Sequence, residues 1–161
     1  MTRLALDIQA ETPLDHTTTV ILKQTVSAVL AYEQVAGDVS LSLLLTDDEQ
    51  MRQLNRDFAG LDEPTDVLSF PIGEGDNGLP DGMLPDELAG YLGDIAISMM
   101  KAERQAEKGG HPLTAELQLL TVHGVLHLLG HDHYNPEEKD VMWAAQKAIL
   151  DLLGVAVTIP E

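Results

Sequence analysis

The sequence predicts an α/β (α+β) fold in which a small mixed β-sheet of about four strands is flanked by about five helices. Segments with alternating polar and apolar residues are interleaved with longer segments whose apolar residues recur every three or four positions. The 161 residues are 44% hydrophobic, which is enough to build a substantial core. Because there is no internal repeat or evident linker, we expect residues 1–161 to form a single domain.

Four short segments have the alternation or the content of β-branched and aromatic residues typical of strands. They are residues 3–9, 38–46, 65–71 and 91–98. In "DVSLSLLLT", the side chains of Val39, Leu41, Leu43 and Leu45 share one face, which predicts that this face is buried. Pro71 closes the third strand because it has no amide hydrogen to donate to a neighbour.

Five amphipathic segments are predicted to be helices, and a glycine follows four of them. They are residues 17–35, 47–59, 99–108, 115–129 and 136–153. Thr46 and Glu49 have the spacing of a capping box at the start of the second helix. Ser98, Thr114 and Asn135 are the predicted N-caps of the last three helices.

Composition limits the classes of partner. The formal net charge is -18, from nine Lys and Arg against 27 Asp and Glu, so the chain has no general attraction for nucleic acid. An anionic substrate must therefore bind locally or be delivered by a partner. The absence of cysteine excludes disulfides and thiolate metal sites. No apolar run approaches the roughly 20 residues of a membrane span, and the N-terminus does not resemble a signal peptide. We expect a cytoplasmic protein with no membrane partner.

The stretch "HGVLHLLGHDH", residues 123–133, holds four of the six histidines. His123 and His127 would stack on one helix face, Gly130 would end that helix, and His133 would follow on a turn. This spacing predicts that three neutral imidazoles bind one divalent transition metal and leave an open position, as in catalytic zinc sites. Copper, nickel and iron also suit imidazole ligands, but one zinc ion is expected because zinc is redox-silent and common at such sites. His131 falls outside the spacing and is predicted to have a surface role.

Other interpretations of these residues remain open. Histidines on an apolar helix can be core residues with hydrogen-bond partners. Asp132 could orient a metal-bound imidazole or accept a proton from an attacking water, or it could bond its own backbone in a turn. Secreted zinc peptidases have the same ligand spacing, but they carry a glutamate base directly after the first histidine. Gly124 occupies that position here, which argues against a peptidase.

Together with "LNRDFAGLDEPTDVLSFP" (54–71) and "LGDIAIS" (92–98), the histidine motif resembles the YbeY family of bacterial rRNA maturation endoribonucleases over residues 38–150. The resemblance implies a metal-dependent hydrolase domain with His123, His127 and His133 as ligands. It implies a single-strand-specific endoribonuclease that matures the 3′ end of 16S rRNA and takes part in ribosome quality control. Its expected partners are rRNA, small-subunit ribosomal proteins and an assembly GTPase, and DNA is not an expected substrate.

One departure from the family pattern concerns a catalytic or substrate-handling arginine that usually precedes the glycine after the second helix. Ala59 stands at that position, and Arg56, one turn earlier, is a candidate replacement for contacting phosphate. An ordinary exposed helix arginine is the alternative interpretation. Two other functions stay open: a non-catalytic ribosome assembly factor with a structural metal site, and a metal-dependent peptidase. Whether water or the RNA 2′-hydroxyl attacks is also open.

Overall fold

The computed structural model describes residues 2–11, 14–59, 66–71, 90–131 and 135–155. Nine elements follow one another along the chain: β1 (Thr2–Ala10), α1 (His16–Tyr32), β2 (Gly37–Thr46), α2 (Asp48–Ala59), β3 (Val67–Pro71), β4 (Tyr91–Ser98), α3 (Met99–Gly109), α4 (Leu113–Leu128) and α5 (Pro136–Leu153).

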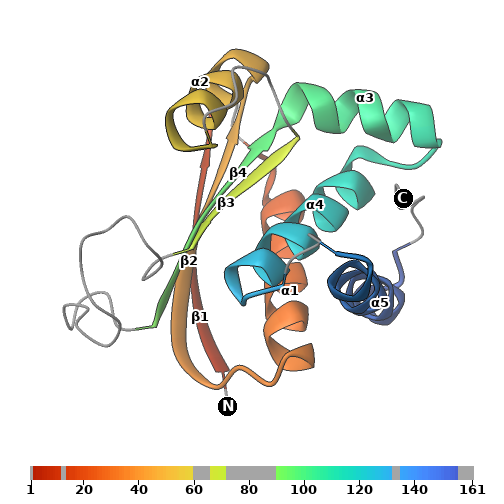
Figure 1. The fold of residues 1–161 in the computed structure, drawn as a ribbon. Helices are drawn as coiled ribbons and strands as arrows, with labels where there is room; N and C mark the ends of the chain where they lie inside the picture. Colours follow the sequence, from red (N-terminus) through yellow and green to blue (C-terminus); the bar gives the residue numbers. More distant parts are fainter. Residues whose placement is uncertain (1, 12–13, 60–65, 72–89, 132–134, 156–161) are drawn as a thin grey trace.

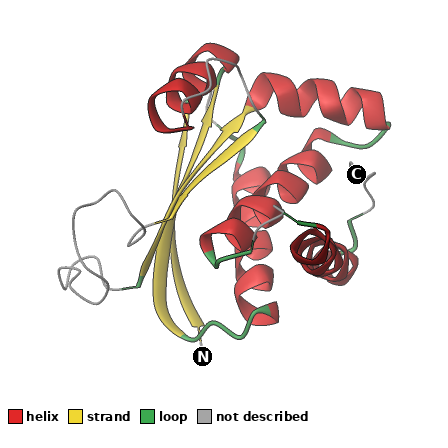
Figure 2. Cartoon of the chain, viewed as in Figure 1, coloured by secondary structure: helices red, strands yellow, loops and turns green. Residues whose placement is uncertain are grey.

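The four strands form one mixed sheet in the order β1-β2-β4-β3 (Figure 2). β1 and β4 are both parallel to the central strand β2, and β3 runs antiparallel to β4 at one edge. In β2 the four side chains predicted to share a buried face are all at most 7% exposed. The predicted fold class, with about four strands and about five helices, is confirmed for the part of the chain that the structure describes.

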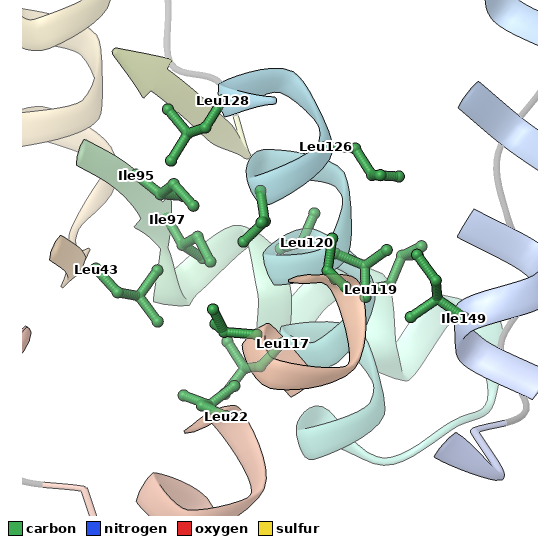
Figure 3. Packing of buried hydrophobic residues seen from close by; sticks show 14 of the residues in the cluster. Leu22, Leu43, Ile95, Ile97, Leu117, Leu119, Leu120, Leu126, Leu128 and Ile149 are labelled. Carbon is green, nitrogen blue, oxygen red and sulfur yellow. The ribbon is translucent and has the colours of Figure 1, made fainter. Parts of the chain in front are cut away.

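Helices α1, α4 and α5 lie together on one side of the sheet, with α2 at one end of it (Figure 1). α4 is the central element of this layer, because it packs against α1, α3, α5, β3 and β4. Its leucines interdigitate with apolar side chains of α1, β2, β4 and α5, including Leu22, Leu43, Ile95 and Ile149 (Figure 3). Burying an aliphatic side chain of this size contributes roughly 1.5–3 kcal/mol, so α4 is held firmly against the sheet.

Gly124 allows α4 to approach β4 closely. A Cβ atom built at this position would lie 2.8 Å from Cγ2 of Ile95, a side chain with no exposed surface. The helix face at Gly124 is therefore in contact with the sheet.

Two of the four predicted helix N-caps are confirmed and two are wrong. Ser98 Oγ accepts a hydrogen bond from the Lys101 amide at 3.1 Å, and Asn135 Oδ1 accepts one from the Glu138 amide at 2.8 Å. The cap of α2 is Asp47, whose Oδ1 accepts from the Gln50 amide at 2.8 Å.

The two wrong caps have different physical reasons. Thr46 belongs to the end of β2, where its hydroxyl is buried and donates to Glu11 Oε1 at 2.8 Å, so it is not available to cap α2. α4 begins at Leu113, one residue before Thr114, and its N-cap is Pro112, which forms no side-chain capping bond.

Among the described helices, none combines the length and the apolar character that crossing a membrane requires.

Candidate functional site

The histidine pair lies on a helix that is otherwise almost entirely buried. All 16 residues of α4 are described, and after Thr114 the partly exposed ones are His123 and His127. Because they are four residues apart, they share the one strip of the helix surface that neighbouring elements leave uncovered. Polar rings at this strip are positioned by a rigid helix.

The two imidazoles face each other through their Nε2 atoms, which are 3.1 Å apart. The rings meet edge to face, with centroids 4.7 Å apart and an interplanar angle of 70°. Two imidazole nitrogens bound to one tetrahedral zinc at about 2.0–2.1 Å would be roughly 3.3 Å apart. The pair therefore fits two ligand positions of one metal ion with little rearrangement.

The other residues predicted for this site, Asp132 and His133, lie outside the described residues. Within the described ranges, no group of three His, Asp or Glu side chains could hold a metal ion. The three-histidine site therefore stays a prediction for its third member.

The chain after α4 turns as the glycine predicts. Gly130 has a φ of +103°, a left-handed conformation that favours glycine, and the amide of His131 donates back to the carbonyl of Leu126 at 3.0 Å. The imidazole of His131 pairs with Glu33, the C-cap residue of α1. Its ring is thus directed to α1, which agrees with the prediction that it stands apart from the ligand set.

A tight set of contacts holds the ring of His123. Its Nδ1 lies 2.6 Å from Oε1 of Gln146 on α5, and the indole of Trp143 packs edge to face at a centroid distance of 5.8 Å. On the sheet side, Ser69 Oγ of β3 donates to the carbonyl oxygen of Gly124 at 3.2 Å. Three elements, α4, α5 and β3, thus fix the position of this histidine.

A pocket of about 200 Å³ lies beside His123, and we call it the histidine-side pocket. Its wall combines apolar side chains with polar ones, among them Asp66, Gln105, Glu116 and Gln146. Burial raises the pKa of Glu116, and its hydrogen bond with His111 partly offsets this increase. The pocket borders a candidate metal ligand and is lined by groups that can form hydrogen bonds.

A second pocket of about 390 Å³ lies at the carboxyl ends of the parallel strands, and we call it the strand-end pocket. Its wall includes four acidic side chains, Glu11, Asp15, Asp47 and Glu103, and the apolar side chains of Leu14 and Met99. The described lining contains no Lys, Arg or His. This pocket is therefore unsuited to a polyanion.

The role of Arg56 as a phosphate contact stays a prediction. Arg56 is half-exposed in the last turn of α2, and its Nε lies 3.5 Å from Oδ1 of the adjacent Asp57. α2 packs against β4 and α3, and it lies apart from α4 (Figure 1).

Sequence reasoning missed Gln146 and Trp143. Gln146 is 1% exposed and occupies the buried stripe of α5 with Met142, Ala145 and Ile149. A glutamine at a core position of an amphipathic helix was the available signal, because a buried amide requires a hydrogen-bond partner.

Fold and site together define a small α/β protein whose central helix presents paired candidate metal ligands beside a polar pocket. Comparison with known proteins then gives the family. A family model described as "Endoribonuclease YbeY" matches residues 6–154. The chain belongs to the YbeY endoribonuclease family, as the sequence motifs predicted.

Similar proteins agree with this assignment. The chain is 41% identical over 147 residues to the endoribonuclease YbeY of Brevibacillus brevis, covering 89% of this chain and 91% of that protein. It is 42% identical over 149 residues to that of Carboxydothermus hydrogenoformans, covering 92% and 95%. The solution structure of TM1509 from Thermotoga maritima has a TM-score of 0.59 and 26% identity, covering 93% of this chain and 90% of that one.

Proposed function

We propose that this protein is a zinc-dependent endoribonuclease that cuts single-stranded RNA. Family membership supports the reaction class, because the family model and the curated relatives are endoribonucleases. The observation that carries the metal dependence is the 3.1 Å approach of His123 Nε2 and His127 Nε2 on an otherwise buried helix.

The proposed ligands are His123, His127 and His133, which would leave one position open for substrate or water. When bound, the ion supplies Lewis acidity that polarises a phosphate oxygen or activates the attacking hydroxyl. Asp132 is proposed to accept a proton or to orient a ligand imidazole. α4 keeps the rings of His123 and His127 in place because its remaining faces are packed against the core.

Three of the chain's arginines already have acidic neighbours. Arg52, Arg56 and Arg104 each have a carboxylate within 4.0 Å. Arg56 would have to leave Asp57 to contact phosphate. Lys139 of α5 lies instead over the ring of Trp143, 5.4 Å from its centroid, and that ring packs against His123. We propose Lys139 as a phosphate contact at this site.

The proposed substrate is ribosomal RNA, and the proposed tasks are 3′-end maturation of 16S rRNA and ribosome quality control in the cytoplasm. A net charge of -18 repels free RNA, so the substrate is best supplied by a complex that already holds it. Small-subunit ribosomal proteins and an assembly GTPase are the proposed partners.

Metal analysis of the purified protein, combined with an RNA-cleavage assay, tests this function. We expect about one zinc per chain, cleavage of an unstructured RNA, loss of cleavage with a chelator, and recovery on adding zinc. A duplex of the same sequence should resist cleavage. Cleavage that persists in chelator-treated, metal-free protein contradicts the metal dependence, and bound zinc without any cleavage contradicts the enzyme.

The strong negative charge and Ala59 favour a second candidate, a non-catalytic assembly factor whose metal site is structural. The two functions differ in what His127→Ala does in cells that lack the natural protein. Failure of a folded, metal-free His127→Ala variant to restore rRNA maturation supports the endoribonuclease. Full restoration supports the assembly factor. A peptidase is not favoured, because the position of its glutamate base is Gly124, which faces Ile95 in the core.

A further inference from the structure

Gln146 is a buried amide with a specific partner. It is 1% exposed on α5, and its Oε1 lies 2.6 Å from Nδ1 of His123 on α4. Taking an amide out of water without a hydrogen bond is unfavourable, so a glutamine at a core position needs a partner such as this one. The same contact has a consequence for the imidazole.

An amide oxygen only accepts hydrogen bonds, so the proton in this contact belongs to Nδ1 of His123. A neutral imidazole carries one ring proton, and a proton on Nδ1 leaves Nε2 with its lone pair. That Nε2 faces His127 Nε2 at 3.1 Å, where the pair fits one metal ion. Before metal binds, His127 Nε2–H is then the donor of this short contact.

We propose that Gln146 is a positioning residue that holds His123 in its Nδ1–H tautomer and directs Nε2 to the metal. This inference rests on the metal site of the proposed function and adds a residue from a different helix to it. Gln146 acts through His123 and does not itself bind the ion.

The surroundings of His123 support a role in orientation. The rings of Trp143 and His123 meet at an interplanar angle of 86°, while Gln146 holds Nδ1. Both residues come from α5, which packs on α4 and begins only seven residues after α4 ends. The histidine ring is therefore held on two sides by one neighbouring helix, and rotation about its Cβ–Cγ bond would break the bond to Gln146.

The acceptor of the His123 hydrogen bond, Oε1 of Gln146, is uncharged, so substitutions at this position can either add a charge to the acceptor or remove the acceptor. Metal-bound histidines often donate to a carboxylate, which raises the basicity of the ligand nitrogen. Gln146→Glu would keep an acceptor of the same reach and add a negative charge near the cation. Zinc should therefore bind this variant at least as tightly as the natural sequence. Gln146→Leu keeps the approximate volume and removes the acceptor.

Gln118 provides a matched control on α4. It is also a buried glutamine, 9% exposed, and its Nε2 donates to Thr25 Oγ1 at 3.1 Å. Gln118→Leu removes a buried amide from the same core but leaves the contacts of His123 intact. A purely structural role for buried glutamines would make the two Leu variants behave alike.

The first experiment reads the tautomer directly in the full-length, metal-free protein by long-range ¹H–¹⁵N NMR of labelled histidines. We expect His123 to be in the Nδ1–H form in the natural sequence and in Gln118→Leu. In Gln146→Leu the Nε2–H form should gain most of the population. An unchanged tautomer in folded Gln146→Leu overturns the proposal.

The second experiment measures zinc affinity by competition with a chromophoric chelator. Loss of an outer hydrogen-bond partner of a ligand histidine typically weakens metal binding about 10–100-fold, and we expect this for Gln146→Leu. Gln118→Leu should stay within about twofold of the natural sequence, since it leaves the site intact. Equal affinities for both Leu variants, or weaker zinc binding by Gln146→Glu than by Gln146→Leu, overturn the role of Gln146.

The results separate this proposal from the proposed function. If zinc affinity depends on Gln146 but no RNA is cut, the endoribonuclease function fails and the positioning role stands. If RNA cleavage requires zinc but Gln146→Leu binds it normally, the positioning role fails and the function stands.

Discussion

Of the strand-end pocket and the histidine-side pocket, fold topology alone predicts the strand-end pocket as the binding site, but the candidate metal ligands border the other one. In α/β sheets, ligands usually bind outside the carboxyl ends of the strands, and the strand-end pocket of about 390 Å³ lies there. The candidate metal ligands border the smaller pocket of about 200 Å³, next to α4. Neither size nor place in the fold identifies the site here.

The chemistry of the two linings explains the difference. The strand-end pocket has four acidic side chains, which repel the phosphates of RNA, and no described histidine. The histidine-side pocket also has two acidic side chains, Asp66 and Glu116, but it adds an imidazole with a second one adjacent, two amides and an indole. Donor chemistry, rather than size or place in the fold, is therefore the reason to choose the histidine-side pocket as the candidate site.

Among the tests of this comparison, removing one candidate metal ligand should have the largest effect. His127→Ala should lose bound zinc and lower RNA cleavage at least about a thousandfold, because a metal ion supplies several kcal/mol of transition-state stabilisation and 1.4 kcal/mol is tenfold in rate. Glu103→Gln in the strand-end pocket should leave cleavage within about twofold, since it contacts neither ligand. Measured single-turnover rates that fall equally in both variants would break the comparison.

The close approach of α4 to β4 allows a second test of the comparison between the two pockets, because this contact holds the histidines in place. Gly124→Ala should lower the free energy of unfolding by about 1 kcal/mol, since overpacking costs about 1–3 kcal/mol and the better helix propensity of alanine returns about 1 kcal/mol. Urea unfolding measures this. With Ile95→Ala in the same chain, the new methyl group gains space, so the combined loss should be smaller than the sum of the two single losses. Strict additivity would show that the contact is not tight.

The sequence predicted the parts of the fold that depend on local periodicity. Val39, Leu41, Leu43 and Leu45 lie on one buried face because side chains alternate along a strand. The helical spacing of four also brought the imidazoles of His123 and His127 together. Thr46 was misassigned as a cap because its hydroxyl is engaged by Glu11, which is distant in sequence.

The partners of the site were beyond sequence reasoning for the same reason. Gln146 meets His123 only after α5 has folded back on α4, and no local pattern encodes that pairing. Arg56 was chosen by its position in α2, and the structure shows its Nε 3.5 Å from Oδ1 of the adjacent Asp57, a contact that the position alone did not predict. Residues that act through tertiary contacts need the structure.

Removing one positive charge tests which of the two pockets binds RNA, and the expected effect is smaller. Lys139→Ala should weaken binding of single-stranded RNA about three- to tenfold, equivalent to roughly 0.7–1.4 kcal/mol, and reduce the salt dependence by about one phosphate contact. Lys147→Ala is the matched control on α5, because its ammonium is exposed and pairs with Asp151 at 3.1 Å. Fluorescence anisotropy at several salt concentrations measures both. Equal losses would mean that Lys139 acts only through general charge.

The smallest expected effects are opposite pH dependences of two carboxyls, Asp48 next to the strand-end pocket residue Asp47 and Glu116 in the histidine-side pocket. Hydrogen bonds from Arg104 and Ser98 lower the pKa of Asp48, the first residue of α2, which lies near the carboxyl end of β4. Its stabilising contribution is present above the unfolded-state pKa and is lost as the pH falls through the folded-state value. Asp48→Asn should therefore reduce the loss of stability in acid.

Glu116 in the histidine-side pocket has the opposite sign, because burial raises its pKa. Its favourable contribution is complete below the unfolded-state pKa and is lost as the pH rises through the folded-state value. As the pH rises from acidic to neutral, the free energy of unfolding of Glu116→Gln should therefore increase relative to the natural sequence. That of Asp48→Asn should decrease relative to the natural sequence as the pH rises through the range in which Asp48 titrates. Urea unfolding from acidic to neutral pH measures both slopes. Parallel slopes would mean that the hydrogen bond with His111 outweighs burial at Glu116, and the two carboxyls would then not differ in the sign of their pKa shifts.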